Sequence, residues 1–197
     1  MKKNLMFALS VSFLMISGCS PVRVGRIDAG DEVDLSGYWN DTDSRLVAEE
    51  VIKDCLSRGW LQDFTSRTDK KPRIIVGTVK NMSSEHIATA AFVKDMEREL
   101  INSGKVVFVA GSSEREEIRQ ERADQQKFSE DAKAFFKEKA ADFILQGGIN
   151  SILDSAGKKT LRYYQVELEL VNVETNEKVW IGQKKIKKLV KRSRFGL

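Results

Sequence analysis

The sequence has one histidine, two cysteines and two prolines among its 197 residues. Because Ser-His-Asp and Cys-His sites both require a histidine, any such site would have to use His86. The chain has no paired Cys-x-x-Cys, no His-Glu-x-x-His and no glycine-rich nucleotide loop. We therefore expect no catalytic residues, no metal site, no cofactor and no small-molecule substrate.

The chain also lacks a long apolar run. Residues 5–16 are almost wholly apolar, but a membrane-spanning helix needs roughly 20 such residues. Lys2 and Lys3 precede this run and the small residues Ser17 and Gly18 follow it, an order typical of a secretory signal peptide. A core helix is the alternative, but the run has no one-sided apolar stripe. We assign residues 1–18 to a cleaved signal.

The signal ends in Ile16-Ser17-Gly18-Cys19, which resembles the bacterial lipoprotein box. The resemblance implies a thioether-linked lipid on Cys19, cleavage before it, and acylation of the new amino terminus, for example with palmitate. Two or more acyl chains anchor a protein stably in a membrane, whereas a single chain does not. Lipoprotein sorting rules add that Ser20 favours the outer membrane, with the domain facing the periplasm.

The mature chain divides into a lipidated N-terminus and short linker (19–37), one domain (38–190) and a basic C-terminal tail (191–197). The linker, of about 18 residues, reaches roughly 60 Å when fully extended. The segment from Lys184 to Leu197 has seven basic residues and no acidic one. Such a tract is usually a solvated chain end, and the alternative is contact with an anionic surface such as phospholipid headgroups. We expect no nucleic-acid partner for an exported protein.

Apolar residues at helical spacing predict helices over 43–57 and 88–103, a short helical turn near 60–64, and a helix over 129–140. The polar stretch 112–126 predicts an exposed helix or an ordered excursion. Cys55 lies on the apolar stripe of the first helix, so we expect a buried, unreactive thiol and no disulfide framework. On the second helix we expect one buried face, made of Phe92, Val93, Met96, Leu100 and Ile101.

Strands are predicted over 73–80, 106–110, 142–153, 161–173 and 178–187. The strand–helix–strand order of the first pair predicts parallel pairing, and short turns predict antiparallel hairpins for the last three. Alternation predicts that Tyr164, Val166, Leu168 and Leu170 face the core, with Glu167 and Glu169 on a solvated face. Gly147-Gly148 suggests a bulge. The fold class is therefore α/β, a single domain with a mixed sheet of about five strands flanked by helices.

Three segments combine polar groups with aromatic ones, a mixture that suits a protein-binding surface but also suits capped turns. They are residues 37–44, 79–86 and 174–185, and the three tryptophans Trp39, Trp60 and Trp180 are expected at the core or its edge. The candidate partner contacts are Asn81, Ser83, Ser84, Glu85, His86, Thr175, Asn176 and Trp180.

The segments "VGTVKNMSSEHI", "LINSGKVVFVA", "ADFILQGGINSI" and "LELVNVETNEKVWIGQKK" resemble, in this order, segments of the LpoB family of outer-membrane lipoproteins. The likeness covers about residues 38–188. It implies a fold similar to the N-terminal domain of TolB and no catalysis by the domain itself. It further implies a class A penicillin-binding protein as the partner, whose peptidoglycan synthesis the domain would activate.

Two other functions remain open at this point. A structural subunit of an envelope or secretion lipoprotein assembly is the alternative to an activator, since related α/β folds occur in oligomeric outer-membrane lipoproteins. A cell-wall hydrolase could use the carboxylates of Glu167 and Glu169, which share a strand face, and its activity should disappear in Glu167→Gln or His86→Ala.

Overall fold

The computed structural model describes residues 24–131 and 138–191. The predicted signal peptide, the lipidation at Cys19 and residues 192–197 of the tail lie outside the described residues. The chain divides into a unit Met1–Asp31 and a unit Glu32–Leu197. In the first unit, Asp28 closes a turn by accepting the amide N–H of Gly30 at 2.7 Å. Among the described helices, none is both long and apolar enough to cross a membrane.

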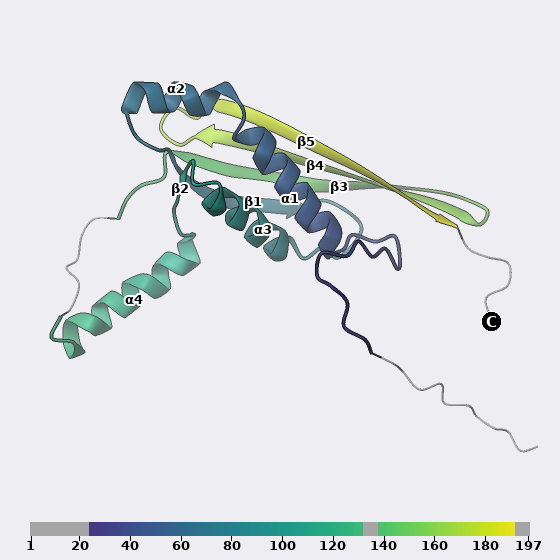
Figure 1. The fold of residues 1–197 in the computed structure, drawn as a ribbon, viewed down its shortest axis with the longest axis horizontal. Coiled ribbons are helices and arrows are strands. Elements are labelled where there is room, and N and C mark those ends of the chain that lie inside the picture. The colour runs from purple at the N-terminus through teal and green to yellow at the C-terminus, as the bar shows by residue number, and fades with distance from the viewer. Residues whose placement is uncertain (1–23, 132–137, 192–197) are drawn as a thin grey trace, which may run out of the picture. The chain divides into compact units, whose positions relative to one another are not determined.

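The second unit contains one mixed sheet of five strands, in the order β2-β1-β3-β4-β5 (Figure 1). β1 pairs in parallel with β2 and β3, and β3, β4 and β5 form consecutive antiparallel hairpins. Both predicted pairing modes are therefore confirmed. The strands are β1 Arg73–Asn81, β2 Val107–Phe108, β3 Phe143–Ala156, β4 Lys159–Asn172 and β5 Lys178–Lys191.

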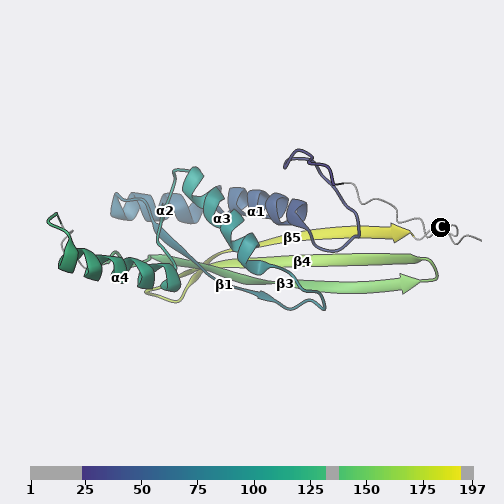
Figure 2. The ribbon, with the colours of Figure 1, turned by 90° about the horizontal axis from the view of Figure 1, so that it is seen from below.

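Three helices lie on one side of this sheet, α1 Asp41–Cys55, α2 Gly59–Thr68 and α3 Thr89–Asn102 (Figure 2). α1 contacts β5 and α3, and α3 contacts β1. We call the face they cover the inner face and the opposite one the outer face. The fourth helix, α4 Ser112–Phe128, buries none of its residues, which confirms the exposed helix expected there.

The start of α1 follows from Asn40, the residue immediately before the helix. Its side-chain oxygen accepts the amide N–H of Asp43 at 3.0 Å, and the Asp43 carboxylate accepts the amide N–H of Asn40 at 3.0 Å. This reciprocal pair satisfies two of the amide groups that the first turn of a helix leaves free. The position of Asp43 is thereby fixed, which matters for the ion pairs described below.

The core fills the space between the inner face and the helices. The predicted inward row Tyr164, Val166, Leu168 and Leu170 is almost fully buried, as is Cys55 beneath α1. On α3, Phe92, Met96 and Leu100 are buried and Val93 packs against the core. Ile101 was wrongly assigned to this face, since it is 55% exposed at the C-terminal end of the helix.

Four further expectations need correction. Residues 129–131 and 138–140 are not helical, so a helix over 129–140 is wrong at both ends, and residues 132–137 lie outside the described part. The strand expected over 106–110 is reduced to Val107–Phe108. The helical turn near Trp60 is longer than expected and forms a ten-residue helix, α2. The basic tract from Lys184 to Lys191 is the end of β5 and not a solvated chain end.

The predicted bulge at Gly147-Gly148 lies on the neighbouring strand. Val76 is opposite Leu145 and Val79 is opposite Gly147, so β1 contains the extra residue, while β3 pairs with β4 without interruption. The two glycines have a different role. Neighbouring atoms lie so close to each of them that a side chain would not fit. A Cβ at Gly147 would lie 2.0 Å from the Glu167 carbonyl oxygen, and one at Gly148 would lie 2.4 Å from Met82 Cε.

Candidate functional site

The loop between β1 and α3, together with Asn81 at the end of β1, contains five of the eight predicted contact residues, and Asn81 organises it. The Asn81 side-chain oxygen accepts the amide N–H and the hydroxyl of Ser83, at 3.0 and 2.6 Å. Its side-chain nitrogen donates to the Glu85 carbonyl at 2.7 Å. These bonds hold the backbone in one conformation and leave Ser84 and His86 exposed.

Glu85 attaches this loop to the sheet through a group that we call the Glu85 cluster: Glu85, Arg162, Tyr164 and Tyr38. The carboxylate pairs with Arg162 and accepts the Tyr164 hydroxyl at 2.6 Å. The guanidinium of Arg162 in turn lies 3.6 Å above the ring of Tyr38. Burial raises the pKa of Tyr164, and the hydrogen bond to Glu85 raises it further. Tyr164 therefore remains a hydrogen-bond donor at neutral pH.

The remaining predicted contacts lie elsewhere. Thr175 and Asn176 form the β4–β5 turn, where the Asn172 side chain accepts the amide N–H groups of Glu174 and Thr175. Asn176 adopts a left-handed conformation with φ of 60°. Val173, at the start of this turn, donates to the Asp142 carbonyl, whereas Asn81 lies opposite Ile149. Asp142 and Ile149 are seven residues apart along extended chain. The β4–β5 turn and the β1–α3 loop are therefore separated by about 23 Å along the sheet, at 3.3 Å per residue.

Trp180 is part of the inner face rather than of the exposed turn. Its ring fills the space above Gly182, and its indole N–H donates to Asp54 of α1 at 2.9 Å. Only 6% of the residue is exposed. Trp39 and Trp60 also contact the core through edge-to-face ring pairs, Trp39 with Phe92 and Tyr164 and Trp60 with Phe143. The structure thus confirms the expected core or core-edge position of all three tryptophans.

The segment that leads into α1 crosses the inner face near the end of β5. Lys188 donates to Asp34 at 2.5 Å, to Asp43 at 2.6 Å and to the Tyr38 carbonyl at 3.2 Å. These three bonds use all three donors of the ammonium group. Lys188 holds the pKa of Asp34 below its ordinary value by donating this hydrogen bond and through its charge. We call residues 32–39 the entry segment.

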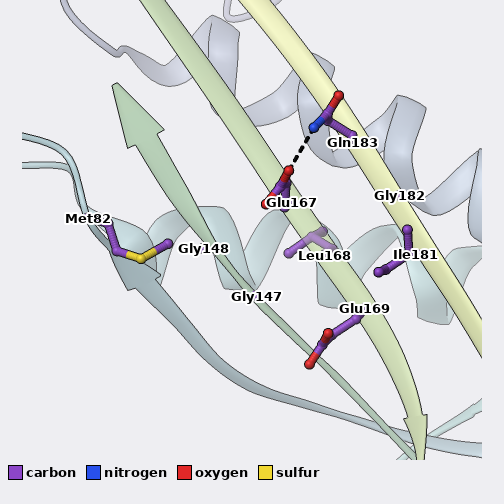
Figure 3. A pocket seen from close by; sticks show the side chains of 9 residues that line it. All are labelled: Met82, Gly147, Gly148, Glu167, Leu168, Glu169, Ile181, Gly182 and Gln183. Atoms are coloured by element: carbon purple, nitrogen blue, oxygen red, sulfur yellow. Dashed lines mark hydrogen bonds between the residues drawn. The ribbon is translucent and has the colours of Figure 1, made fainter. Parts of the chain in front are cut away.

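On the outer face, a hollow of about 340 Å³ lies over Gly148, between Met82 of the β1–α3 loop and Ile181 of β5 (Figure 3). Glu167 on its floor accepts hydrogen bonds from Gln165 and Gln183, at 2.6 and 2.7 Å. Its walls combine a thioether, an aliphatic side chain and a carboxylate. Such a mixture can accept a side chain of another protein.

The same geometry bears on catalysis. Lys178 and Gln146 hold the pKa of Glu169 below its ordinary value, whereas a glycosidic general acid needs a raised pKa. Desolvation raises the pKa of the Cys55 thiol to about 12, which opposes a role as nucleophile. His86 is exposed. Among the described residues, no group of His, Cys, Asp and Glu side chains could hold a metal ion.

Sequence reasoning missed Asp34, Tyr38, Arg162 and Lys188. Lys188 was counted with a basic end of the chain, although Ile186 and Val190 beside it continue the alternation of β5. That alternation is the signal that places Lys188 on the inner face. No sequence pattern predicts the contacts of Arg162, because its partners Glu85 and Tyr38 are about 77 and 124 residues away in sequence.

Comparison with curated protein sequences gives no significant match. Among solved structures, the fold is similar to the LpoB C-terminal domain from Salmonella enterica, at 13% identity and a TM-score of 0.43, covering 74% of this chain and 99% of that one. It is similar to the NMR structure of E. coli LpoB at 11% identity and 0.43, covering 97% and 91%. It is also similar to the PelC dodecamer from Paraburkholderia phytofirmans at 16% identity and 0.33, covering 64% and 76%.

The sequence model of the family described as "Peptidoglycan-synthase activator LpoB" matches residues 43–186. The match runs from the first turn of α1 into β5, and so spans β1 to β4, α2 to α4, and most of α1 and β5. It confirms the resemblance drawn from the sequence segments. On this match, the chain belongs to the LpoB family of peptidoglycan-synthase activators.

Proposed function

We propose that this chain is a lipid-anchored protein that binds a class A penicillin-binding protein and raises its rates of glycan polymerisation and cross-linking. The family match over residues 43–186 carries the proposal. The anchor is the lipid proposed for Cys19, in the outer membrane with the domain facing the periplasm. The low pKa of Glu169 and the buried Cys55 support a role without catalysis by the domain itself.

An activator without catalytic groups must act through differential binding. It raises the activity of the synthase only by binding the active conformation more tightly than the inactive one. A rigid contact surface favours this, because little conformational entropy is lost when it binds. The β1–α3 loop is such a surface, since its own hydrogen bonds and the Glu85 cluster hold it against the sheet.

The interface that we propose comprises this loop and the hollow beside it. Met82 belongs to both, because it follows β1 and its methyl group lies over Gly148 (Figure 3). The β4–β5 turn with Thr175 and Asn176 is a second contact about 23 Å away by strand rise. A partner domain would have to bridge this distance to touch both.

The test uses the fragment Glu32–Leu197, which contains the entire hydrophobic core. Mixed with a class A synthase from the same organism, it should cross-link to the synthase and accelerate glycan polymerisation. Ser84→Arg should weaken both effects, whereas Asp63→Arg on α2 should not. If the fragment has no effect on any class A synthase of the organism, the proposal is wrong. A large oligomeric mass in that case would favour a structural subunit of an envelope assembly.

A further inference from the structure

At the end of the sheet that contains the β3–β4 turn, the outer face carries lysines whose charges are not neutralised within the domain. Lys158, Lys159, Lys185, Lys187 and Lys191 are exposed, and none forms an ion pair with another described residue. The inner-face lysines differ, since Lys184 pairs with Glu50 and Lys188 with Asp34 and Asp43. One face of the same strand is thus neutralised and the other is not.

Strand register places most of these lysines on one surface. Directly opposed residues of an antiparallel sheet share a face, and rows two residues apart lie on the same side. Successive outer rows are Asn150–Gln165–Lys185, Ile152–Tyr163–Lys187, Asp154–Leu161–Leu189 and Ala156–Lys159–Lys191. We call these four rows the lysine face. Asp154 is its one acidic residue.

Apolar side chains lie between these lysines. Ile152 is 63% exposed and Leu189 is 55% exposed, and both share the surface with Leu161 and Tyr163. Lys187 lies 5.9 Å from the centre of the Tyr163 ring. Lysines that flank exposed aliphatic and tyrosine side chains are typical of a surface that rests on a bilayer. There the apolar groups enter the headgroup region and the ammonium groups meet anionic headgroups.

The sequence that follows the proposed anchor at Cys19 enters the domain through the entry segment, at this end of the sheet. The entry segment crosses the opposite face of the same strands, where Gly37 lies against Val190 and Arg162 and where Asp34 pairs with Lys188. Figure 2 shows β3, β4 and β5 continuing past the start of α1 at this end. Only twelve residues separate Cys19 from Glu32. Fully extended, this length of chain spans roughly 45 Å.

We propose that the lysine face rests on an anionic phospholipid bilayer. The proposal rests on the lipid anchor assigned to Cys19 for its orientation, but the binding itself needs only the residues of the face. Charge complementarity alone would also allow a soluble polyanion. The exposed Ile152 and Leu189 favour a bilayer, because an aqueous polyanion offers no apolar layer to bury them.

The experiment measures partition of the fragment Glu32–Leu197, which lacks Cys19, onto vesicles by co-sedimentation. Vesicles of phosphatidylcholine with about one third phosphatidylglycerol should bind it, and pure phosphatidylcholine vesicles should not. Raising the salt from about 0.1 M to about 0.5 M should release it, since screening shortens the reach of the charges.

The deciding variant is Lys185→Gln/Lys187→Gln/Lys191→Gln. Each lysine near an anionic bilayer strengthens binding about fivefold, so the triple variant should bind about 100-fold more weakly. The matched control, Lys53→Gln/Lys105→Gln/Lys127→Gln, removes the same charge from exposed positions elsewhere and should bind within a few-fold of the parent. Circular dichroism melting should show that both variants are folded.

Three results would overturn the proposal. One is binding that does not depend on phosphatidylglycerol, and another is an equal loss in the control triple variant, which would indicate net charge alone. The third is tight binding to a soluble polyanion such as heparin with no binding to anionic vesicles. None of these bears on the activator role, which is measured with a detergent-solubilised synthase in the absence of anionic vesicles.

Discussion

The ammonium of Lys188 lies 2.6 Å from Oδ2 of Asp43, the same carboxylate oxygen that accepts the Asn40 amide at the start of α1. The side chains of Lys188 and Asp43 are 9% and 8% exposed. Through this oxygen, the last strand of the sheet is bonded to the cap of the first helix. A buried ion pair of this kind is costly to break from one side, because the remaining charge has no partner.

Lys188→Met should therefore destabilise the domain by about 3 kcal/mol, since the buried Asp43 carboxylate would lose its ammonium partner. Urea unfolding of the fragment Glu32–Leu197 measures this. Lys187→Met, on the exposed outer face, is the control and should change the free energy of unfolding by less than about 0.5 kcal/mol. Equal values for the two variants would show that the Lys188 pair contributes no more than a surface charge.

Asp34 should make the stability of the domain depend on pH in a defined direction. Lys188 lowers the pKa of Asp34 in the folded state, so the folded state favours the charged carboxylate. Its contribution is present above the unfolded pKa of about 3.9 and is lost as pH falls through the folded pKa. Because Asp34 is largely exposed, we expect a modest effect.

The measurement for Asp34 compares the free energy of unfolding of the parent and of Asp34→Asn over a pH series. The parent should be the more stable protein by a constant margin at neutral pH, and the margin should shrink at pH values below about 4. A margin that is unchanged in acid would argue against the pairing with Lys188.

Gly182 should tolerate no side chain. A Cβ there would lie 2.1 Å from Cζ2 of Trp180, so Gly182→Ala must displace the indole and its hydrogen bond to Asp54. We expect a loss of about 1–3 kcal/mol and a red shift of tryptophan fluorescence. Gly59→Ala is the control, because no atom lies within 4 Å of the added methyl group. It should leave stability equal or raise it by up to about 1 kcal/mol.

Cys55 should be inert in the folded domain. The fragment Glu32–Leu197 contains no other cysteine. Burial, together with the nearby charge of Asp54, raises the pKa of the thiol to about 12 from 9.0, which lowers the thiolate population about a thousandfold at neutral pH. Labelling with a thiol reagent should therefore be slow until denaturant is added. Rapid labelling without denaturant would mean that α1 leaves the sheet readily.

The sequence predicts secondary structure best where one face of a helix or strand is buried and the other is exposed to solvent. The alternation around Tyr164 and Leu170 was read correctly because every second residue meets the core. β3 and β5 continue past their predicted ends, to Ala156 and Lys191, and β4 begins two residues earlier than predicted, at Lys159. The added rows contain polar residues on both faces, so they show no alternation that would predict a strand. Hairpin pairing holds such rows in a sheet, and this pairing is not visible in the polarity of single residues.

The candidate site was only partly predictable for a related reason. Local bonds such as those of Asn81 to Ser83 connect neighbours in sequence, and a polar loop with Asn and Ser indicates them. The Glu85 cluster instead joins residues from β4, the entry segment and the β1–α3 loop. A single sequence gives no spacing rule for contacts of that range, so Arg162 and Lys188 became visible only in the structure.

Lys188 and Asp43 are 145 residues apart in the chain, and they join the first helix of the domain to its last strand. A chain that stops before β5 can cap α1 through Asn40 but leaves Asp43 without its ammonium partner. Folding must therefore wait for the C-terminal strand, since the loop that this contact closes contains nearly the whole domain. We expect the domain to acquire its native structure only after β5 is available to pair with β4.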